Sequence, residues 1–516
     1  MRNIIIGWII GAFLAGSLRG AADGDALLAR IHFAGTASFA GNTNALTLQK
    51  ILALPSTVAW KNFLLDQIAA RPGQRLAEDG NHGPDHSFES IRPLLDDALT
   101  AETYLEWRNS GAFVWTARLP EDRARLWQTN LWKALAEVTG GQPGVLPDGS
   151  GWRYGAAGGF RLARTGAWLI VSSGPEATVN DLTQRIQKTG GPVASLGTNW
   201  LDAEIDWPRL EEKFPALRDL PLRAAHLYLT LSSKSDSIRT VLRAVYPQNL
   251  EWKSEAWHIP AKLIRDPLVS FTAVQNFGVL LREPESLTKL EVDPLRSQSF
   301  FWSQSLAPFQ TFAAVRVKDG PRALQVLSAQ LPASFNPYLS SKKAGLLKGE
   351  SAPPRIAWTG LPLITPSIVA TNEAAGNFLY FSLFPGIPTT NQVPRELTNE
   401  ITGRKNLIYY DWEMSQLRLN NSRVMYDLLP FFPRPRGETL ARPEMSRAYV
   451  LGQSWFDALT PLLGNTVTEV TLEKPNEIRL IRRSQIGLTG MEIVGLERLL
   501  INSGLISPTN SAAAHP

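Results

Sequence analysis

The sequence predicts an α+β protein in which two tandem, related modules form mainly antiparallel sheets with flanking helices, behind a helical lead-in. Three observations predict this class. Units of an apolar strand, a turn and an amphipathic helix recur in both halves of the chain. Strands and helices are interspersed without the steady alternation of a parallel sheet. The 516 residues are 44% apolar and 19% charged, a globular composition whose length favours two or three domains.

The recurring unit is clearest at residues 168–187, where a buried strand, a Ser-Gly-Pro turn and an amphipathic helix follow one another. A looser copy occupies residues 378–401, and residues 110–135 and 310–331 form an earlier pair with the same order of elements. Few residues are identical between the copies. The shared order of elements therefore carries the prediction that the two halves are duplicates, against chance similarity of strand–helix units.

These units divide the chain as follows. We expect a helical N-terminal lead-in over residues 23–109, a first α+β module over 110–300, a second over 301–506 and a disordered tail over 507–516. Within the lead-in, the spacing of apolar residues predicts a helix that runs from Ser87 to Arg108.

The N-terminus has the pattern of a secretory signal peptide over residues 1–22. A short positive start precedes the apolar run Ile4 to Leu14, and Gly20 and Ala22 are small residues at the expected positions before a cut. The apolar run is shorter than the roughly 20 residues of a comfortable membrane span. We therefore expect a periplasmic or secreted protein, with an uncleaved N-terminal anchor as the alternative and no integral membrane segment once the leader is removed.

Composition excludes several classes of site. The chain has no cysteine, so it has no disulfide, thiolate metal site or cysteine nucleophile. The net charge of +5 comes from 52 basic and 47 acidic residues, a balance without the clustered basic face expected of a nucleic-acid-binding protein. Neither a phosphate-binding glycine loop nor a serine-hydrolase elbow is present, and no cofactor is expected.

The residues SSGPEA at 172–177, between an apolar strand and a helix, belong to the recurring unit. This pattern resembles uncharacterised exported bacterial families with repeated α+β modules, and the resemblance covers most of residues 110–500. It implies a secreted or periplasmic location. It transfers no functional residue.

One loop gathers potential metal ligands. Asp79, His82, Asp85 and His86 lie within eight residues, and imidazole and carboxylate groups this close could hold a divalent ion. Gly83 and Pro84 break the helix that would align the two imidazoles, so a solvated loop is the competing interpretation.

Basic residues increase in the second half, where Arg434 and Arg436 lie in an extended PRPRG segment. Guanidinium groups there could bind an anionic envelope polymer or lipid head groups through bidentate contacts. An arginine-rich solvated loop is the alternative.

Each half also carries an Asp-Trp pair predicted at the end of a strand, Asp206-Trp207 and Asp411-Trp412. A carboxylate beside an indole suits sugar binding, since the ring stacks and the acid accepts hydroxyl hydrogen bonds. The alternative is a buried Trp at the end of a strand with an Asp that caps the next element, and recurrence in both halves favours this structural interpretation, because duplicated packing positions persist as a pair.

These observations predict an exported, non-catalytic cell-envelope protein with a binding or scaffolding role. The alternative is a secreted hydrolase, dependent on a metal held by the His and Asp loop, that acts on an envelope or extracellular polymer. The absence of a recognisable catalytic motif favours the first.

Overall fold

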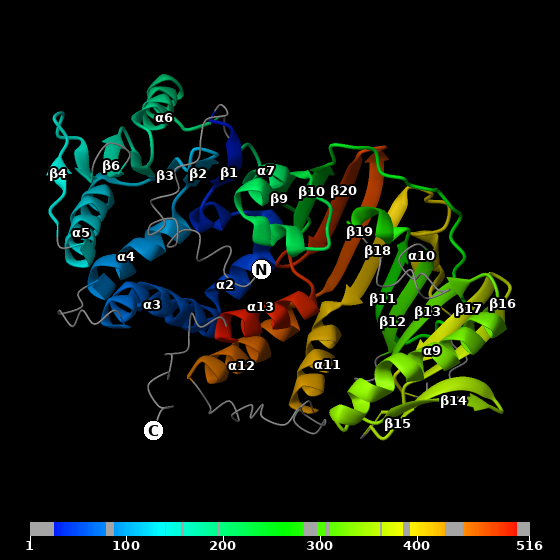
Figure 1. Ribbon diagram of the computed structural model, residues 1–516. Helices are drawn as coiled ribbons and strands as arrows, with labels where there is room; N and C mark the ends of the chain where they lie inside the picture. The colour runs from blue at the N-terminus through cyan, green and yellow to red at the C-terminus, as the bar shows by residue number, and fades with distance from the viewer. Residues whose placement is uncertain are drawn as a thin grey trace.

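In a computed structural model of the chain, twenty strands form one antiparallel sheet that is flanked by eleven helices (Figure 1). The structure describes residues 25–78, 87–139, 141–155, 159–193, 196–282, 297–304, 310–361, 364–384, 393–428 and 447–502, and all statements below concern these residues. The predicted mixed α+β class with antiparallel pairing is confirmed.

The strands fall into two sets of ten along the chain. The first set is β1 (Leu27–Phe33), β2 (Thr103–Arg108), β3 (Phe113–Arg118), β4 (Gly144–Val145), β5 (Gly151–Tyr154), β6 (Phe160–Thr165), β7 (Trp168–Ser173), β8 (Asn199–Asp206), β9 (His226–Lys234) and β10 (Ser237–Val245). The second set is β11 (Leu268–Gln275), β12 (Gln298–Gln304), β13 (Thr311–Val317), β14 (Leu346–Ser351), β15 (Pro354–Thr359), β16 (Ser367–Glu373), β17 (Gly376–Ser382), β18 (Leu407–Met414), β19 (Asn465–Lys474) and β20 (Glu477–Ser484).

The helices are α2 (Leu46–Ala53), α3 (Pro55–Glu78), α4 (Ser87–Thr100), α5 (Glu121–Thr139), α6 (Glu176–Thr189), α7 (Trp207–Lys213), α9 (Gly320–Ser341), α10 (Arg395–Asn399), α11 (Ser415–Leu428), α12 (Arg447–Leu459) and α13 (Gly490–Asn502). Short 3-10 helices occur at Thr36–Phe39, Thr43–Ala45, Pro215–Asp219, Phe277–Leu280 and Thr460–Leu462.

Strand pairing gives both sets the same spatial order. Across the first set the order is β4-β5-β6-β7-β3-β2-β1-β8-β9-β10. Across the second it is β14-β15-β16-β17-β13-β12-β11-β18-β19-β20. The last strands of the two sets, β10 and β20, pair with each other and make the sheet continuous. The seam between the sets therefore lies near the middle of the sheet.

The burial of β7 explains why the strand of the unit at 168–187 is a continuous apolar run. Leu169 and Val171 pack into a core with α5 on one face of the sheet, while Trp168 and Ile170 pack with α6 on the other. Each of the four is at most 3% exposed. Fully burying a side chain of this size stabilises the fold by about 1.5–3 kcal/mol, so both helices are held firmly to the sheet.

In the second set, side chains also pack on both faces of the sheet, and aromatic rings fill one of the two cores. Trp302, Phe312 and Phe378 are at most 2% exposed and form a core with α10, while Leu379 packs with α9 on the opposite face. Trp302 stacks on Phe312 with ring centroids 5.6 Å apart. Aromatic burial of this extent dominates core energetics.

One predicted element is wrong. The helix expected from Ser87 to Arg108 ends at Thr100, and Thr103–Arg108 forms β2. The segment TYLEWR alternates in burial, with Tyr104 and Glu106 on one face and Leu105 and Trp107 on the other. Pairing with β1 and β3 on either side overrides the helical spacing that the sequence shows.

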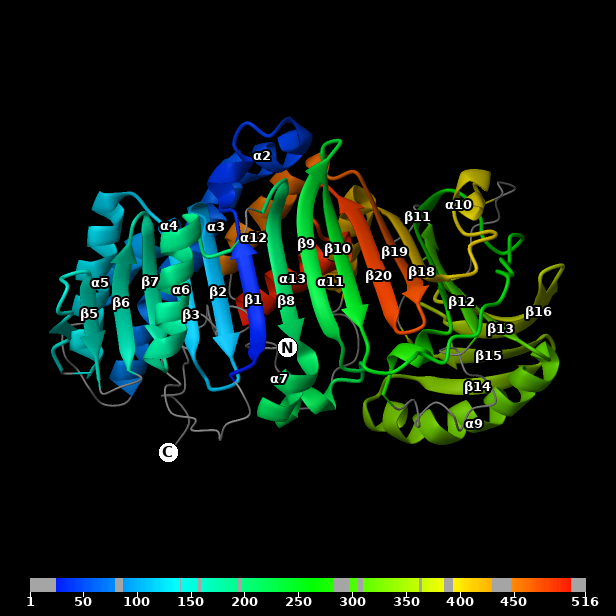
Figure 2. The same ribbon diagram turned by 90° about the horizontal axis from the view of Figure 1, so that it is seen from above.

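The two faces of the sheet differ near its middle. Helix α2 packs on β8, β9 and β10, and α11, α12 and α13 lie on the same side beneath β18, β19 and β20 (Figure 1). The other side, which we call the open face, carries Arg30, Tyr228, Val241 and Ile481. Seen from that side, α6 and α10 lie over its flanks, and no helix of the described residues lies over β9, β10, β20 or β19 (Figure 2).

Candidate functional site

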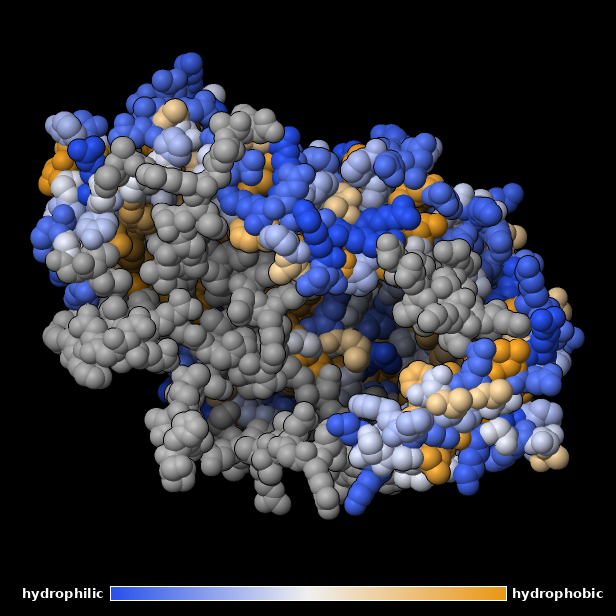
Figure 3. All heavy atoms as spheres, in the orientation of Figure 1, coloured by the Kyte–Doolittle hydropathy of each residue, from blue (hydrophilic) through white to orange (hydrophobic). Residues whose placement is uncertain are grey.

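Period-two alternation makes the open face polar. Along β10, Ile238, Thr240, Leu242 and Ala244 face the helices, while the residues between them reach the open face. Hydrophilic residues accordingly gather along the upper margin of the molecule, above the middle of the sheet (Figure 3). A sheet surface that is neither covered nor apolar is free to meet a polar ligand.

A cavity of about 880 Å³ opens on this face, over β1, β8, β9 and β10 and beside the end of α6. The charged or titratable groups of its lining come from Arg30, Arg185, Arg243, Asp202, Glu204 and His32, and Tyr228 adds a phenol ring. Arg30 and Glu204 are direct cross-strand partners whose nitrogen and oxygen are 2.5 Å apart. Arg243 lies over the ring of Tyr228 at 5.5 Å from its centroid.

A buried ion-pair network supports the wall formed by α6. Glu106, only 3% exposed, accepts hydrogen bonds from Tyr104 Oη, from Arg185 at 2.8 Å and from Arg108 at 3.1 Å. Burial raises the pKa of Glu106, but the hydrogen bonds from Tyr104 and Arg185 outweigh it, and the net pKa is lowered. Burial raises the pKa of Tyr104. Glu106 is therefore a fixed carboxylate that holds Arg185 at the cavity.

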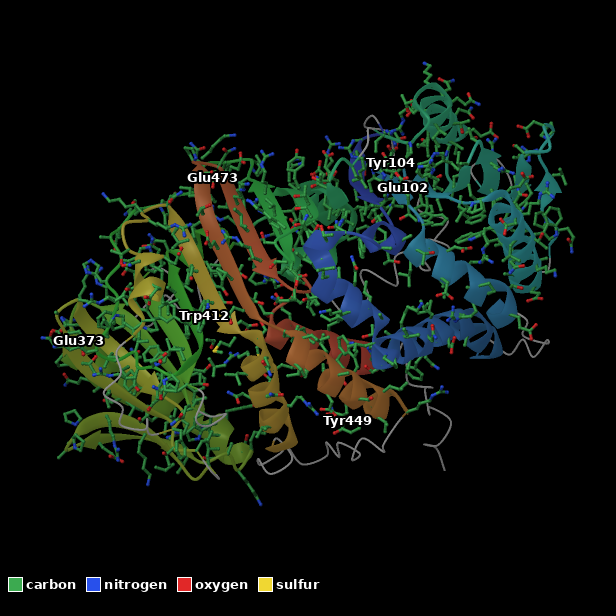
Figure 4. The ribbon with its side chains drawn as sticks, turned by 180° about the vertical axis from the view of Figure 1, so that it is seen from behind. Glu102, Tyr104, Glu373, Trp412, Tyr449 and Glu473 are labelled. Carbon is green, nitrogen blue, oxygen red and sulfur yellow. The ribbon has the colours of Figure 1, made fainter. Side chains whose placement is uncertain are left out.

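His32 of β1 is a second group of the cavity lining that a carboxylate holds in place. It is 4% exposed, and its Nε2 lies 2.9 Å from Glu102 Oε1. The hydrogen bond from His32 lowers the pKa of the Glu102 carboxyl, with Arg118 adding to the effect. Glu102 and Tyr104 lie near one another at the β2 side of the sheet (Figure 4). The imidazole is thus engaged by a carboxylate of the protein itself.

Four arginines stand at the seam between the two strand sets. Arg239 of β10 lies directly opposite Arg483 of β20, and Arg243 lies opposite Arg479, with Val241 opposite Ile481 between the two pairs. We call Arg239, Arg243, Arg479 and Arg483 the arginine quartet. Directly opposite side chains project from the same face, so all four belong to the open face with Arg243 of the cavity.

The quartet is only partly neutralised. Arg243 donates to Glu477 at 2.8 Å, and Arg483 approaches Glu469 at 4.0 Å. Within the described residues, Arg239 and Arg479 form no ion pair, and the enclosed Nε of each has no hydrogen-bond acceptor. The hydrogen bonds from Arg243 and Lys474 lower the pKa of Glu477 to about 2. Glu477 therefore stays ionised over a wide pH range, while the guanidinium charges of Arg239 and Arg479 remain available to an anion.

The structure places the first Asp-Trp pair at an element boundary. Asp206 ends β8 and caps α7 by accepting from Arg209 N at 3.2 Å, and Trp207 Nε1 donates to Glu211 at 2.6 Å. Both polar groups thus have partners within the protein. These contacts match the capping interpretation; sugar binding by this pair stays a prediction.

The second pair lies elsewhere in its strand. Asp411 and Trp412 are inside β18, which continues to Met414, and Trp412 packs against the core beneath α10 (Figure 4). Asp206 is the last residue of β8, whereas three further residues of β18 follow Asp411. The expectation that each Asp-Trp pair ends a strand is therefore wrong for Asp411-Trp412.

The other predicted residues lie outside the part of the chain that the structure describes. This applies to Arg434 and Arg436, and to the loop with Asp79, His82, Asp85 and His86. Elsewhere, in the described residues, no three His, Asp or Glu side chains gather in a way that could hold a metal ion. The metal-dependent hydrolase stays a prediction, which metal analysis of the purified protein with and without chelator would test.

Sequence reasoning missed the arginine quartet, although its signal is visible. The segments SIRTVLRAV and EIRLIRRS each carry a pair of arginines four residues apart in an alternating strand pattern, and the second segment has a third arginine, Arg482. A spacing of four places the two arginines of each pair on one face. The alternation does not show which strand pairs with each segment.

The chain has no significant match among protein-family models, curated proteins or solved structures. None of the helices in the described ranges combines the length and apolar character that crossing a membrane would require.

Proposed function

We propose that the protein is an exported, non-catalytic cell-envelope protein that binds or scaffolds an anionic envelope polymer along its open face. The observation that carries this proposal is the arginine quartet at the seam of an uncovered sheet. Two guanidinium groups held opposite each other repel in the absence of a counter-charge, and an anion placed between them removes that repulsion. The adjoining cavity, with Arg30 and Arg185, extends the same surface.

We further propose that the two strand sets are tandem related modules. The support is their common spatial order, in which each strand of the first set has a counterpart ten strands later. A boundary between β10 and β11 is supported by the pairing of β11 with β12 and β18 of the second set. Under this proposal β1 and β2, within the predicted lead-in, are integral strands of the first module.

Export is proposed on the sequence pattern of residues 1–22, which lie outside the described residues. The expected mature protein begins at Asp23 and is periplasmic or secreted. N-terminal sequencing of protein recovered from the envelope or medium tests this. A retained Met1 would support the anchor alternative.

Envelope binding is tested by retention of the mature protein on peptidoglycan, on an anionic polysaccharide and on anionic liposomes at low salt. We expect retention on an anionic polymer, with release as ionic strength rises, because exposed charges are screened beyond about 10 Å at 0.1 M salt. Lack of retention on all three at low salt contradicts the proposal. A neutral polysaccharide is the matched control, because it can stack on aromatic side chains but carries no charge.

A further inference from the structure

We propose that the arginine quartet holds two phosphate groups of one linear phosphate-bearing polymer. The inference rests on the proposed function and names its ligand class. Each phosphate lies between two opposed guanidinium groups, one group between Arg239 and Arg483 and the other between Arg243 and Arg479. Within each pair one arginine has a carboxylate partner, and the other, Arg239 or Arg479, forms no ion pair with the described residues.

The unsatisfied donors indicate that a ligand completes the site. Arg239 Nε and Arg479 Nε are enclosed, and neither has an acceptor among the described residues. Each opposed pair contains one of these two side chains. A ligand anion would supply the counter-charge that these two guanidinium groups lack among the described residues.

The geometry favours phosphate over carboxylate. Directly opposite side chains start about 5 Å apart at Cβ, so one anion can touch both guanidinium groups of a pair. A carboxylate presents two oxygens in one plane, and a single guanidinium fork satisfies both. A phosphate group within a chain presents two charged oxygens and two bridging oxygens around a tetrahedral centre, so its acceptors point in different directions and can accept from two forks at once.

The spacing favours a chain over a single small anion. Arg239 and Arg243 are four residues apart on one strand, which separates the two pairs by roughly 13 Å at about 3.3 Å per residue. A linear polymer that reaches both pairs gains from effective concentration, because its second phosphate binds intramolecularly. Val241 and Ile481 lie between the pairs and provide an apolar floor.

The surroundings favour a polymer over a lipid bilayer. On the open face α6 and α10 lie on either side of the uncovered strands (Figure 2). Arg239 and Arg479 are half-buried, with no long reach beyond the sheet surface. A flexible chain can enter between the two helices.

The test uses the mature protein and long-chain inorganic polyphosphate, with affinity measured by isothermal titration calorimetry at fixed low salt. The variant R239Q/R479Q removes one arginine from each pair, and neither residue forms an ion pair in the described residues. We expect its Kd for polyphosphate to rise at least about 100-fold, since each charge-assisted contact is worth about tenfold. Each single variant should fall between wild type and the double variant.

The matched control is R153Q/R355Q, which removes the same charge from the exposed face of β5 and β15 near the two outer ends of the sheet. We expect less than about a threefold change in Kd, because exposed pairs such as Arg355–Glu350 contribute little. Circular dichroism checks that all variants fold. An R239Q/R479Q variant that binds polyphosphate as tightly as the control overturns the proposal.

Two further probes test the ligand class. Poly-glutamate of matched charge and phosphatidylglycerol vesicles should each bind wild type at least about tenfold more weakly than polyphosphate; equal binding of either overturns the phosphate-polymer assignment. Envelope retention separates this inference from the proposed function. If the wild-type protein is retained on an envelope polymer but R239Q/R479Q binds polyphosphate with unchanged affinity, the role of the arginine quartet is rejected and the envelope proposal stands. Absence of retention with quartet-dependent polyphosphate binding rejects the envelope proposal alone.

Discussion

Thr272 of β11 and Asp411 of β18 lie directly opposite each other, and Thr272 Oγ1 donates a 2.6 Å hydrogen bond to Asp411 Oδ1. Burial raises the pKa of Asp411 to about 6, while the Thr272 hydrogen bond opposes the rise and the nearby Glu413 adds to it. The carboxylate is thus charged at neutral pH in a place that disfavours charge.

This relationship predicts how stability depends on pH. A carboxyl with a folded-state pKa above its unfolded value lowers stability as pH rises from about 4 to above 6. A rise in the pKa from 3.8 to about 6 corresponds to about 2–3 kcal/mol. We expect Asp411→Asn to raise the free energy of unfolding by up to that amount at pH 8 and to leave it unchanged at pH 4, measured by urea titration.

The control for Asp411 is Asp219→Asn, at an exposed position of a 3-10 helix. Its effect should be small at both pH values. An Asp411→Asn protein that is destabilised equally at pH 4 and pH 8 would show that the Thr272 contact depends on the carboxyl side chain whatever its charge, and would contradict the prediction.

Glu106 has the opposite character, since three donors surround a buried carboxylate whose pKa is lowered. Glu106→Gln leaves Arg185 and Arg108 without their shared counter-charge. We expect a loss of about 3 kcal/mol in the free energy of unfolding at pH 7, because breaking one side of a buried pair is strongly destabilising. Chemical denaturation measures it.

Glu204→Gln is the matched control for Glu106. It removes one half of the partly exposed Arg30–Glu204 pair on the same face and should cost less than about 1 kcal/mol. Similar losses for both variants would mean that the network around Glu106 is no stronger than a surface ion pair.

The arginine quartet predicts an unusual stability change in the absence of ligand. Arg239→Gln with Arg479→Gln removes like-charge repulsion across β10 and β20 without breaking an ion pair of the described residues. We expect the melting temperature to stay the same or rise at low salt, and this gain to disappear at 1 M salt, where the screening length falls to about 3 Å. A melting temperature lowered at both salt concentrations would show that the arginines support the seam.

Part of the fold could be predicted because its signal is local. The run from Trp168 to Ser173 and the helix from Glu176 to Thr189 form where the sequence indicates them, since apolar spacing and a Gly-Pro turn act within a few residues. The extension of a helix to Arg108 failed because β2 is stabilised by pairing with β1, whose residues lie far away in the sequence.

The site could not be predicted for the same physical reason. Alternation along β10 places Arg239 and Arg243 on one face, but it does not say which strand lies beside them. Arg243 and Glu477, which share a 2.8 Å hydrogen bond, are 234 residues apart in the chain. Register between such distant strands is set by the whole sheet.

Glu477 gives the last prediction, an acid-sensitive seam. It accepts from Arg243 at 2.8 Å and from Lys474 at 2.9 Å, and these hydrogen bonds lower its pKa to about 2. A carboxyl with a depressed pKa contributes stability that is present above its unfolded value of about 4.5 and lost as pH falls through about 2.

We therefore expect Glu477→Gln to lower the free energy of unfolding by about 1 kcal/mol at pH 7. This value is smaller than the lowered pKa alone would give, because solvent screens the partly exposed Arg243 and Lys474. The difference from wild type should shrink as pH falls from 4.5 toward 2, as urea titrations across this range would show. Glu350→Gln, which removes the acid of an exposed pair with Arg355, should have little effect at any pH. A Glu477→Gln loss that is constant between pH 7 and pH 2.5 would mean that the side chain stabilises the seam by packing and not by its charge.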